Sequence, residues 1–255
     1  MSKAITSISA TRKKELYEKI KPIAQDARNR IIDKNSIIEN PFYTLEQAGF
    51  FIVGFPSKDD RISGFHIQKS EIHFIYVNTG HDLGRQYFSS FHEYYHIFTG
   101  EESDGNIIEK REHNEIEYKA ECFAGCILMP ENLVKKYIMD HAINLNWLSH
   151  AQLIKMFTYF NVSYNAMLKR LTQLYPGYLN MNKLYGISTK PKRKEFIQKI
   201  KDNDGNEKLI HPTSNLYITQ SFFEDLKFNI ENERISQDKA KGIITMLNSV
   251  AGSID

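Results

Sequence analysis

One stretch of the sequence, residues 82–98, constrains the fold more than any other. Apolar and aromatic residues recur there at helical spacing, and Gly100 with the acidic residues after it ends the pattern. The predicted helix contains His-Glu-Tyr-Tyr-His at 92–96, which places two imidazoles on one helical face. Imidazoles so placed can bind one tetrahedral metal ion, and the glutamate between them can reach a water molecule on that ion. The stretch therefore predicts a metal-dependent hydrolytic site.

The next predicted helix, residues 115–129, offers the third protein ligand that such a site needs. Glu117 and Glu121 lie four residues apart and share one face of this helix, whereas Glu115 points to another side. The loop before the helix contains acids that the metal would have to order: Glu101, Glu102 and Asp104. The pattern leaves Glu117 and Glu121 as alternatives, and the carboxylate that does not bind the metal can accept the N–H of a ligating histidine.

The remaining periodicities predict a mixed α+β fold. Helical spacing marks residues 11–34, and a short helix starting at Thr44 precedes an apolar strand at 50–55. Two β-branched and aromatic runs, 64–68 and 72–77, are separated by three polar residues and predict an antiparallel hairpin. Further helices are expected from Glu131 onward, at 152–160, at 162–175, around 222–226, and over 240–247 after the N-cap Ser236.

Composition excludes several classes of protein. The chain is 41% hydrophobic and 25% charged, a balance that is typical of folded proteins. Its net charge of +2 gives no general attraction to nucleic acid or to a membrane. No run approaches the roughly 18 apolar residues of a membrane span, and the N-terminus lacks the apolar core of a signal peptide. We therefore expect a cytoplasmic protein with no membrane partner, in which Cys122 and Cys126 are buried packing residues.

Four motifs occur in the order that characterises one family. They are Gly-Arg-Gln-Tyr-Phe at 84–88, the His-Glu-x-x-His sequence, Glu-x-x-Ala-Glu-x-Phe-Ala at 117–124, and Ile-Leu-Met-Pro at 127–130. Over about residues 11–175 the chain resembles the ImmA/IrrE family of zinc metallopeptidases. Two positions depart from the family pattern, since Tyr95 stands where the family usually has Gly and Glu121 where it usually has Asn or Asp. A bulky Tyr95 is expected to narrow the cleft or to pack beneath the motif.

The resemblance implies a zinc cofactor and a role for each site residue. His92, His96 and Glu117 are expected to bind zinc, with Glu93 as the general base. Glu121 is expected to be the outer carboxylate that orients a ligating histidine. The implied fold is a zincin-like catalytic domain with a small antiparallel sheet at 11–145 and a helix-turn-helix-like region at 146–185. A C-terminal domain of unknown role follows at 190–255.

The resemblance also implies the function. It is a zinc metalloendopeptidase whose protein substrate is a transcriptional repressor, often of helix-turn-helix type, in stress response or mobile-element control. An extended substrate would add to an exposed edge of the predicted hairpin, at either of its two strands. Few basic residues occur in the helix-turn-helix-like region, so packing rather than DNA contact is expected there. The alternative is a non-catalytic, zinc-containing regulatory module that acts through protein or DNA contacts.

Overall fold

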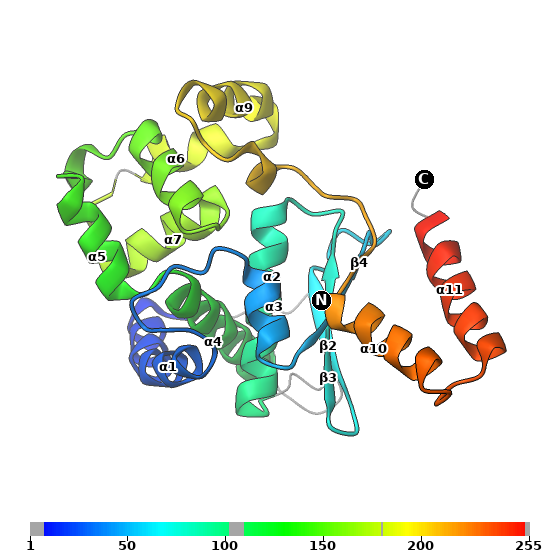
Figure 1. Cartoon of the computed structure of the whole chain (residues 1–255). Coiled ribbons are helices and arrows are strands. Elements are labelled where there is room, and N and C mark those ends of the chain that lie inside the picture. The colour runs from blue at the N-terminus through cyan, green and yellow to red at the C-terminus, as the bar shows by residue number, and fades with distance from the viewer. Residues whose placement is uncertain (1–7, 102–109, 180, 253–255) are drawn as a thin grey trace, which may run out of the picture.

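The structure is a computed structural model that describes residues 8–101, 110–179 and 181–252. Helix α3 packs on a small sheet, α4 packs on α3 and α1 packs on α4, and a group of helices from α5 to α9 covers one end (Figure 1). Helices α10 and α11 project on the opposite side of the sheet (Figure 1). The predicted α+β class is confirmed.

The helices are α1 (Ala10–Ile31), α2 (Pro41–Gln47), α3 (Leu83–Thr99), α4 (Lys110–Leu128), α5 (Glu131–Asp140), α6 (His150–Tyr159), α7 (Tyr164–Leu174), α8 (Met181–Tyr185), α9 (Arg193–Asp202), α10 (Gln220–Glu231) and α11 (Gln237–Gly252). The strands are β1 (Phe51–Phe55), β2 (Gly64–Lys69), β3 (Ile72–Asn78) and β4 (Tyr217–Ile218). Helix α2 begins before the predicted Thr44, because Asn40 caps it through the N–H of Tyr43 and Pro41 suits its first turn.

The sheet has the strand order β2-β3-β1-β4. Strands β2 and β3 form the predicted antiparallel hairpin, but β1 pairs with β3 in parallel, so the small sheet is mixed rather than antiparallel throughout. The apolar strands β1 and β3 take the centre, where both of their faces are covered, and the more polar β2 is left at an edge. Strand β4 comes from far along the chain and pairs antiparallel with β1.

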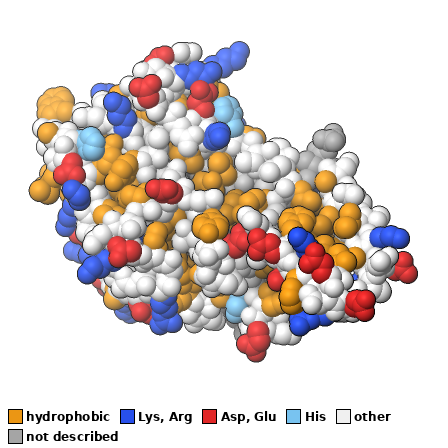
Figure 2. Space-filling model, viewed as in Figure 1, with side chains coloured by type: hydrophobic (Ala, Val, Ile, Leu, Met, Phe, Trp, Pro, Cys, Tyr) orange, Lys and Arg blue, Asp and Glu red, His pale blue; other side chains and the backbone are white. Residues whose placement is uncertain are grey.

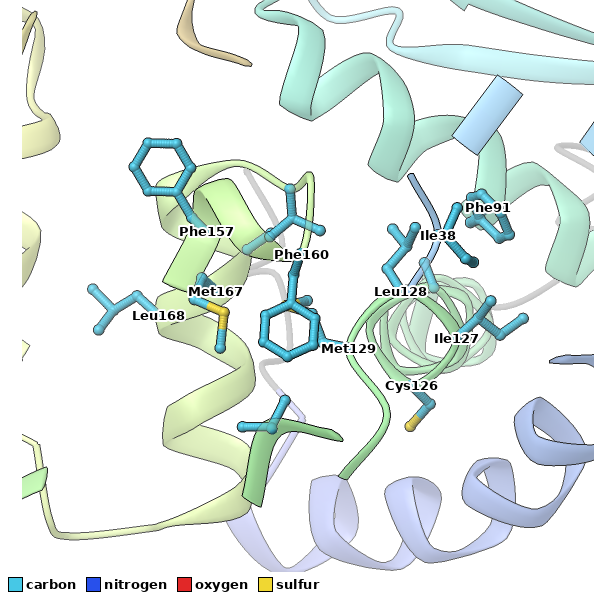
Figure 3. Packing of buried hydrophobic residues seen from close by; sticks show 14 of the residues in the cluster. Ile38, Phe91, Cys126, Ile127, Leu128, Met129, Phe157, Phe160, Met167 and Leu168 are labelled. Atoms are coloured by element: carbon cyan, nitrogen blue, oxygen red, sulfur yellow. The ribbon is translucent and has the colours of Figure 1, made fainter. Parts of the chain in front are cut away.

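One hydrophobic core joins the helices. Figure 3 shows Ile127 and Leu128 of α4 together with Phe91 of α3, and Met129 towards Phe160 at the end of α6. Buried residues of α6 and α7 continue the same cluster, including Phe157, Met167 and Leu168. The region at 146–185 therefore packs onto the helices that carry the site. This packing was expected, because the region has few basic residues with which to contact DNA.

The N-terminus of α3 is held by residues far along the chain. The carboxylate of Asp82, which precedes α3, accepts two hydrogen bonds from Arg193, at 3.0 and 3.1 Å. The N–H of Leu83 donates to the carbonyl of His211, at 2.9 Å. With β4 paired to β1, the segment 193–218 thus packs against the helix that carries the histidine motif.

Helices α10 and α11 bury little of their surface. None of the residues of α10 is buried, and Ala240 is the buried residue of α11. Figure 2 shows hydrophobic side chains gathered over these helices, and the large exposed ones are Phe223, Phe228, Ile244 and Met246. A search of the described helices for a membrane-spanning segment found none.

Gly84 provides a test of the packing around α3. A Cβ at this position would lie 2.7 Å from the backbone nitrogen of Ser163 and 2.9 Å from the carbonyl carbon of Val162. Both atoms belong to backbone that cannot rotate away, so Gly84→Ala should lower the free energy of unfolding by about 1–3 kcal/mol.

Urea unfolding measures this loss. Gly242→Ala is the control, because an added Cβ meets nothing within 4 Å in helix α11 and should leave stability unchanged or raise it by up to about 1 kcal/mol. Equal unfolding midpoints for Gly84→Ala and the wild type would contradict the close approach of α3 to the turn before α7.

Candidate metal centre

The structure brings together His92, His96 and Glu117, the three residues predicted as metal ligands. The histidines lie on successive turns of α3 and the glutamate on the neighbouring α4. His92 Nε2 is 3.0 Å from one carboxylate oxygen of Glu117, and His96 Nε2 is 3.9 Å from the other. Their ligand atoms all lie within 4.8 Å of one another, so one ion can contact all three.

This donor set fits a divalent metal ion. Two imidazole nitrogens and one carboxylate oxygen are the protein ligands of many catalytic zinc sites, which keep a fourth position open. Tetrahedral ligands about 2.1 Å from an ion are about 3.4 Å apart, close to the spacing found here. The side chain of Glu117 is 37% exposed whereas that of His96 is 6% exposed, so the solvent reaches the three side chains on the glutamate side.

The charges around His92 favour a cation. Burial alone lowers the pKa of His92, but the hydrogen bond to Glu117 and the charges of Glu93, Glu117 and Glu121 outweigh it and hold that pKa above its usual value. A histidine pKa raised by neighbouring carboxylates marks a site of negative potential. A divalent metal ion supplies the positive charge that this site lacks.

Glu93 lies between the metal site and the sheet, and its side chain is 11% exposed. A Cβ added to Gly64 of β2 would be 3.5 Å from Glu93 Oε1, so the strand passes directly over the carboxylate. The other oxygen, Oε2, accepts a hydrogen bond from His66 Nδ1 at 3.3 Å. The ring of His66 also stacks on that of His96, with centroids 5.7 Å apart and planes 10° apart.

Reasoning from the sequence did not find the contact of His66 with the site. Contact between a strand and a helix leaves no short-range spacing to detect. One signal was available: Gly64 and His66 are two residues apart in β2, so both lie on the face of the strand that meets α3. A histidine on that face of a strand next to the motif helix was a candidate neighbour.

Two other acids of the prediction are bound to basic residues. Glu115 binds Arg12 of α1 through two hydrogen bonds, at 2.7 and 3.0 Å. Glu121 pairs with Lys169 at 3.3 Å, and in the described part of the chain no hydrogen bond joins it to a ligating histidine. Its role in orienting a histidine stays a prediction. Glu102 and Asp104 lie outside the described residues.

The site opens into a cleft of about 1050 Å³. Helices α3 and α4 and the first residue of β2 line it, α7 with its N-cap contributes Ser163 and Lys169, and the C-terminal segment contributes Lys190 and Arg193. Three stretches of chain that are far apart in sequence therefore share the cleft. A cleft of this volume is at the upper end of the range for small-molecule pockets, so it has room for a segment of a peptide as well.

Comparison with known proteins identifies a family. A family model described as peptidase M78, IrrE N-terminal-like domain, matches residues 45–172, which is half of the chain. A search among curated proteins found no match. The matched region contains β1 to β3 and both helices that carry the metal-binding group. The chain therefore belongs to the IrrE N-terminal-like family of metallopeptidases.

Proposed function

We propose that the chain is a zinc-dependent endopeptidase, with zinc held by His92, His96 and Glu117 and with Glu93 as the general base. One observation carries the proposal. Three ligand groups from two helices converge within 4.8 Å of one another, in a cleft that Glu93 also lines. A catalytic rather than structural site is supported by the three protein ligands, because structural zinc sites have four.

Zinc, when bound, supplies a Lewis acid that polarises the scissile carbonyl and makes a water molecule easier to deprotonate. Glu93 accepts the proton of the attacking water and delivers it to the nitrogen of the leaving amine. His66 holds Oε2 of Glu93 through its Nδ1–H. This leaves Oε1, on the side of Gly64, as the oxygen that exchanges the proton.

The edge strand β2 is the site that we propose for the substrate backbone. Of the two hairpin strands, β2 lies at the edge of the sheet and β3 lies inside it. A peptide that adds to β2 as a further strand passes beside Glu93, because Gly64 lies over this carboxylate. Main-chain hydrogen bonds would then place the scissile bond, and the cleft would accept the side chains.

The substrate that we propose is a transcriptional repressor of helix-turn-helix type, cleaved in the cytoplasm during stress response or mobile-element control. The resemblance to the ImmA/IrrE family supports this choice. Repressor cleavage requires a segment that can become extended along β2, such as a linker between folded parts. Cleavage of a repressor does not need this chain to bind DNA, and the burial of α7 against the core agrees with this.

We also propose a division of the tail. The contacts of 193–218 with α3 and β1 support counting this segment with the catalytic unit. Helices α10 and α11, which bury little, would form an appendage that begins near Gln220. The boundary expected near residue 190 then marks a connection rather than the start of an independent domain.

The ligand assignment predicts a graded loss of metal affinity. Glu117→Ala should lower zinc affinity severely, because only two protein ligands remain. Glu121→Ala should cost about 10- to 100-fold, the range for an outer group at a metal site. Zinc titration of both folded variants is the test. If Glu121→Ala emptied the site while Glu117→Ala left it full, the two roles would have to be exchanged.

The general base predicts a separation of binding from hydrolysis. Glu93→Gln should keep zinc and lose peptidase activity, because an amide cannot accept the proton of water. Incubating the zinc-loaded wild type and this variant with a soluble proteome, and sequencing new N-termini, identifies the substrates. New termini should arise with the wild type alone, and repressors should be among their sources. Equal cleavage by Glu93→Gln would refute the assignment of the base.

The contact between His66 and Glu93 predicts coupled effects. His66→Ala should lower kcat about 10- to 100-fold, as loss of an orienting group does at metal sites. KM and zinc affinity should change little. The residual kcat of Glu93→Gln should fall no further when His66→Ala is added, since His66 acts through Glu93. Gln68→Ala, two residues further along β2, is the control. Additive losses in the double variant would show that His66 acts independently of Glu93.

A further inference from the structure

The residue after the motif helix bonds to one of the proposed ligands. Helix α3 ends at Thr99 and is capped by Gly100, whose φ of 66° is left-handed and turns the chain back over the last helical turn. This turn brings the carbonyl oxygen of Glu101 to 2.7 Å from His96 Nδ1, which donates a hydrogen bond to it. With the proton on Nδ1, the lone pair of His96 is on Nε2, the atom that faces Glu117.

Side chains from two helices fix Glu101 in this position. Its carboxylate oxygen Oε2 accepts a hydrogen bond from the hydroxyl of Tyr95, at 2.6 Å, and another from the ammonium of Lys119. Its N–H donates to Thr99 Oγ1, at 3.2 Å. Tyr95 lies on α3 and Lys119 lies on α4, two residues after Glu117. The carboxylate therefore links the two helices that carry the metal ligands.

We infer that Tyr95, Glu101 and Lys119 form a clamp that positions His96 for metal binding, acting through the backbone carbonyl of Glu101. The inference rests on the proposed metal site and adds three positioning residues to it. A ligating histidine gains orientation and basicity when its second ring nitrogen donates to a fixed acceptor. Here the acceptor is a backbone atom just beyond a helix end, and the clamp holds that backbone in place.

The clamp also gives a function to Tyr95, the residue that departs from the family pattern. Its ring is fully buried and packs against Phe123 of α4, with centroids 5.4 Å apart. Packing explains why the ring is buried, but it does not explain why the hydroxyl donates a hydrogen bond to the carboxylate of Glu101. Tyr94 is a natural control, since it is also buried, also packs on Phe123 at 5.5 Å, and makes only a long 3.4 Å hydrogen bond to Ala27.

The same contacts stabilise the negative charge of Glu101. Burial raises the pKa of Glu101, but hydrogen bonds from Lys119 and Tyr95 outweigh this and keep that pKa below its usual value. These contacts therefore favour the carboxylate form of Glu101, whose oxygen accepts both hydrogen bonds.

The test is the affinity of the full chain for zinc, measured by competition with a chelating dye, beside the unfolding midpoint of each metal-free variant. Tyr95→Phe and Lys119→Met should each weaken zinc binding about 10-fold, and Glu101→Ala more, up to about 100-fold. Adding Tyr95→Phe to Glu101→Ala should cost no further affinity. Tyr94→Phe should leave it unchanged. So should Lys21→Met, which breaks a 2.5 Å ion pair with Glu131 away from the site.

A second measurement separates positioning from packing. The absorption spectrum of bound Co²⁺ reports the geometry of its ligands, and it should change in Tyr95→Phe and Lys119→Met but not in the two controls. Wild-type affinity and an unchanged cobalt spectrum in both clamp variants would overturn the clamp and leave the metal site standing. A wild-type chain that binds no zinc would overturn the metal site and the clamp with it.

Discussion

The packing of α3 against α4 is the contact on which the rest of the structure depends. Both histidines of the candidate site come from α3 and the carboxylate comes from α4, so the ligand distances are set by how the two helices meet. Ala120, fully buried at the contact, is small enough to let the helices approach. Around it, Phe123 packs edge-on against the rings of Tyr94 and Tyr95. Close-packed aromatic rings resist sliding, which keeps the ligands within reach of one ion.

The N-terminus of α3 needs a partner because the first N–H groups of a helix have none within it. In this chain the partner comes from far away in sequence. Arg193 binds the carboxylate of Asp82 with both arms of its guanidinium, and a carbonyl of the same segment receives the N–H of Leu83. Both ends of the helix are thus held by groups outside it, since Glu101 folds back at the other end. A helix fixed at both ends keeps its two histidines in register with α4.

Sequence reasoning reached what short-range spacing determines. The histidine pair, the glutamate helix, the hairpin and the stop at Gly100 all follow from periodicity and end signals, and the structure has these elements. Contacts between distant segments leave no such trace. The local sequence patterns do not predict three such contacts: the approach of His66 to Glu93, the parallel pairing of β1 with β3, and the pairing of β4 with β1. Even the choice between Glu117 and Glu121 needed a family pattern, because both share one helical face.

Burying the site has a cost that the surrounding packing must offset. Glu93 and His96 are 8% and 5% exposed, and polar groups removed from water lose favourable hydration unless they find partners. Each has found one, His66 for Glu93 and the carbonyl of Glu101 for His96. These partners occupy Oε2 of Glu93 and Nδ1 of His96, so Oε1, on the side of Gly64, and Nε2, on the side of Glu117, are the atoms left for other contacts. The same hydrogen bonds that make burial tolerable therefore also determine which atoms remain for chemistry, so the stability of this region and its reactivity have a common origin.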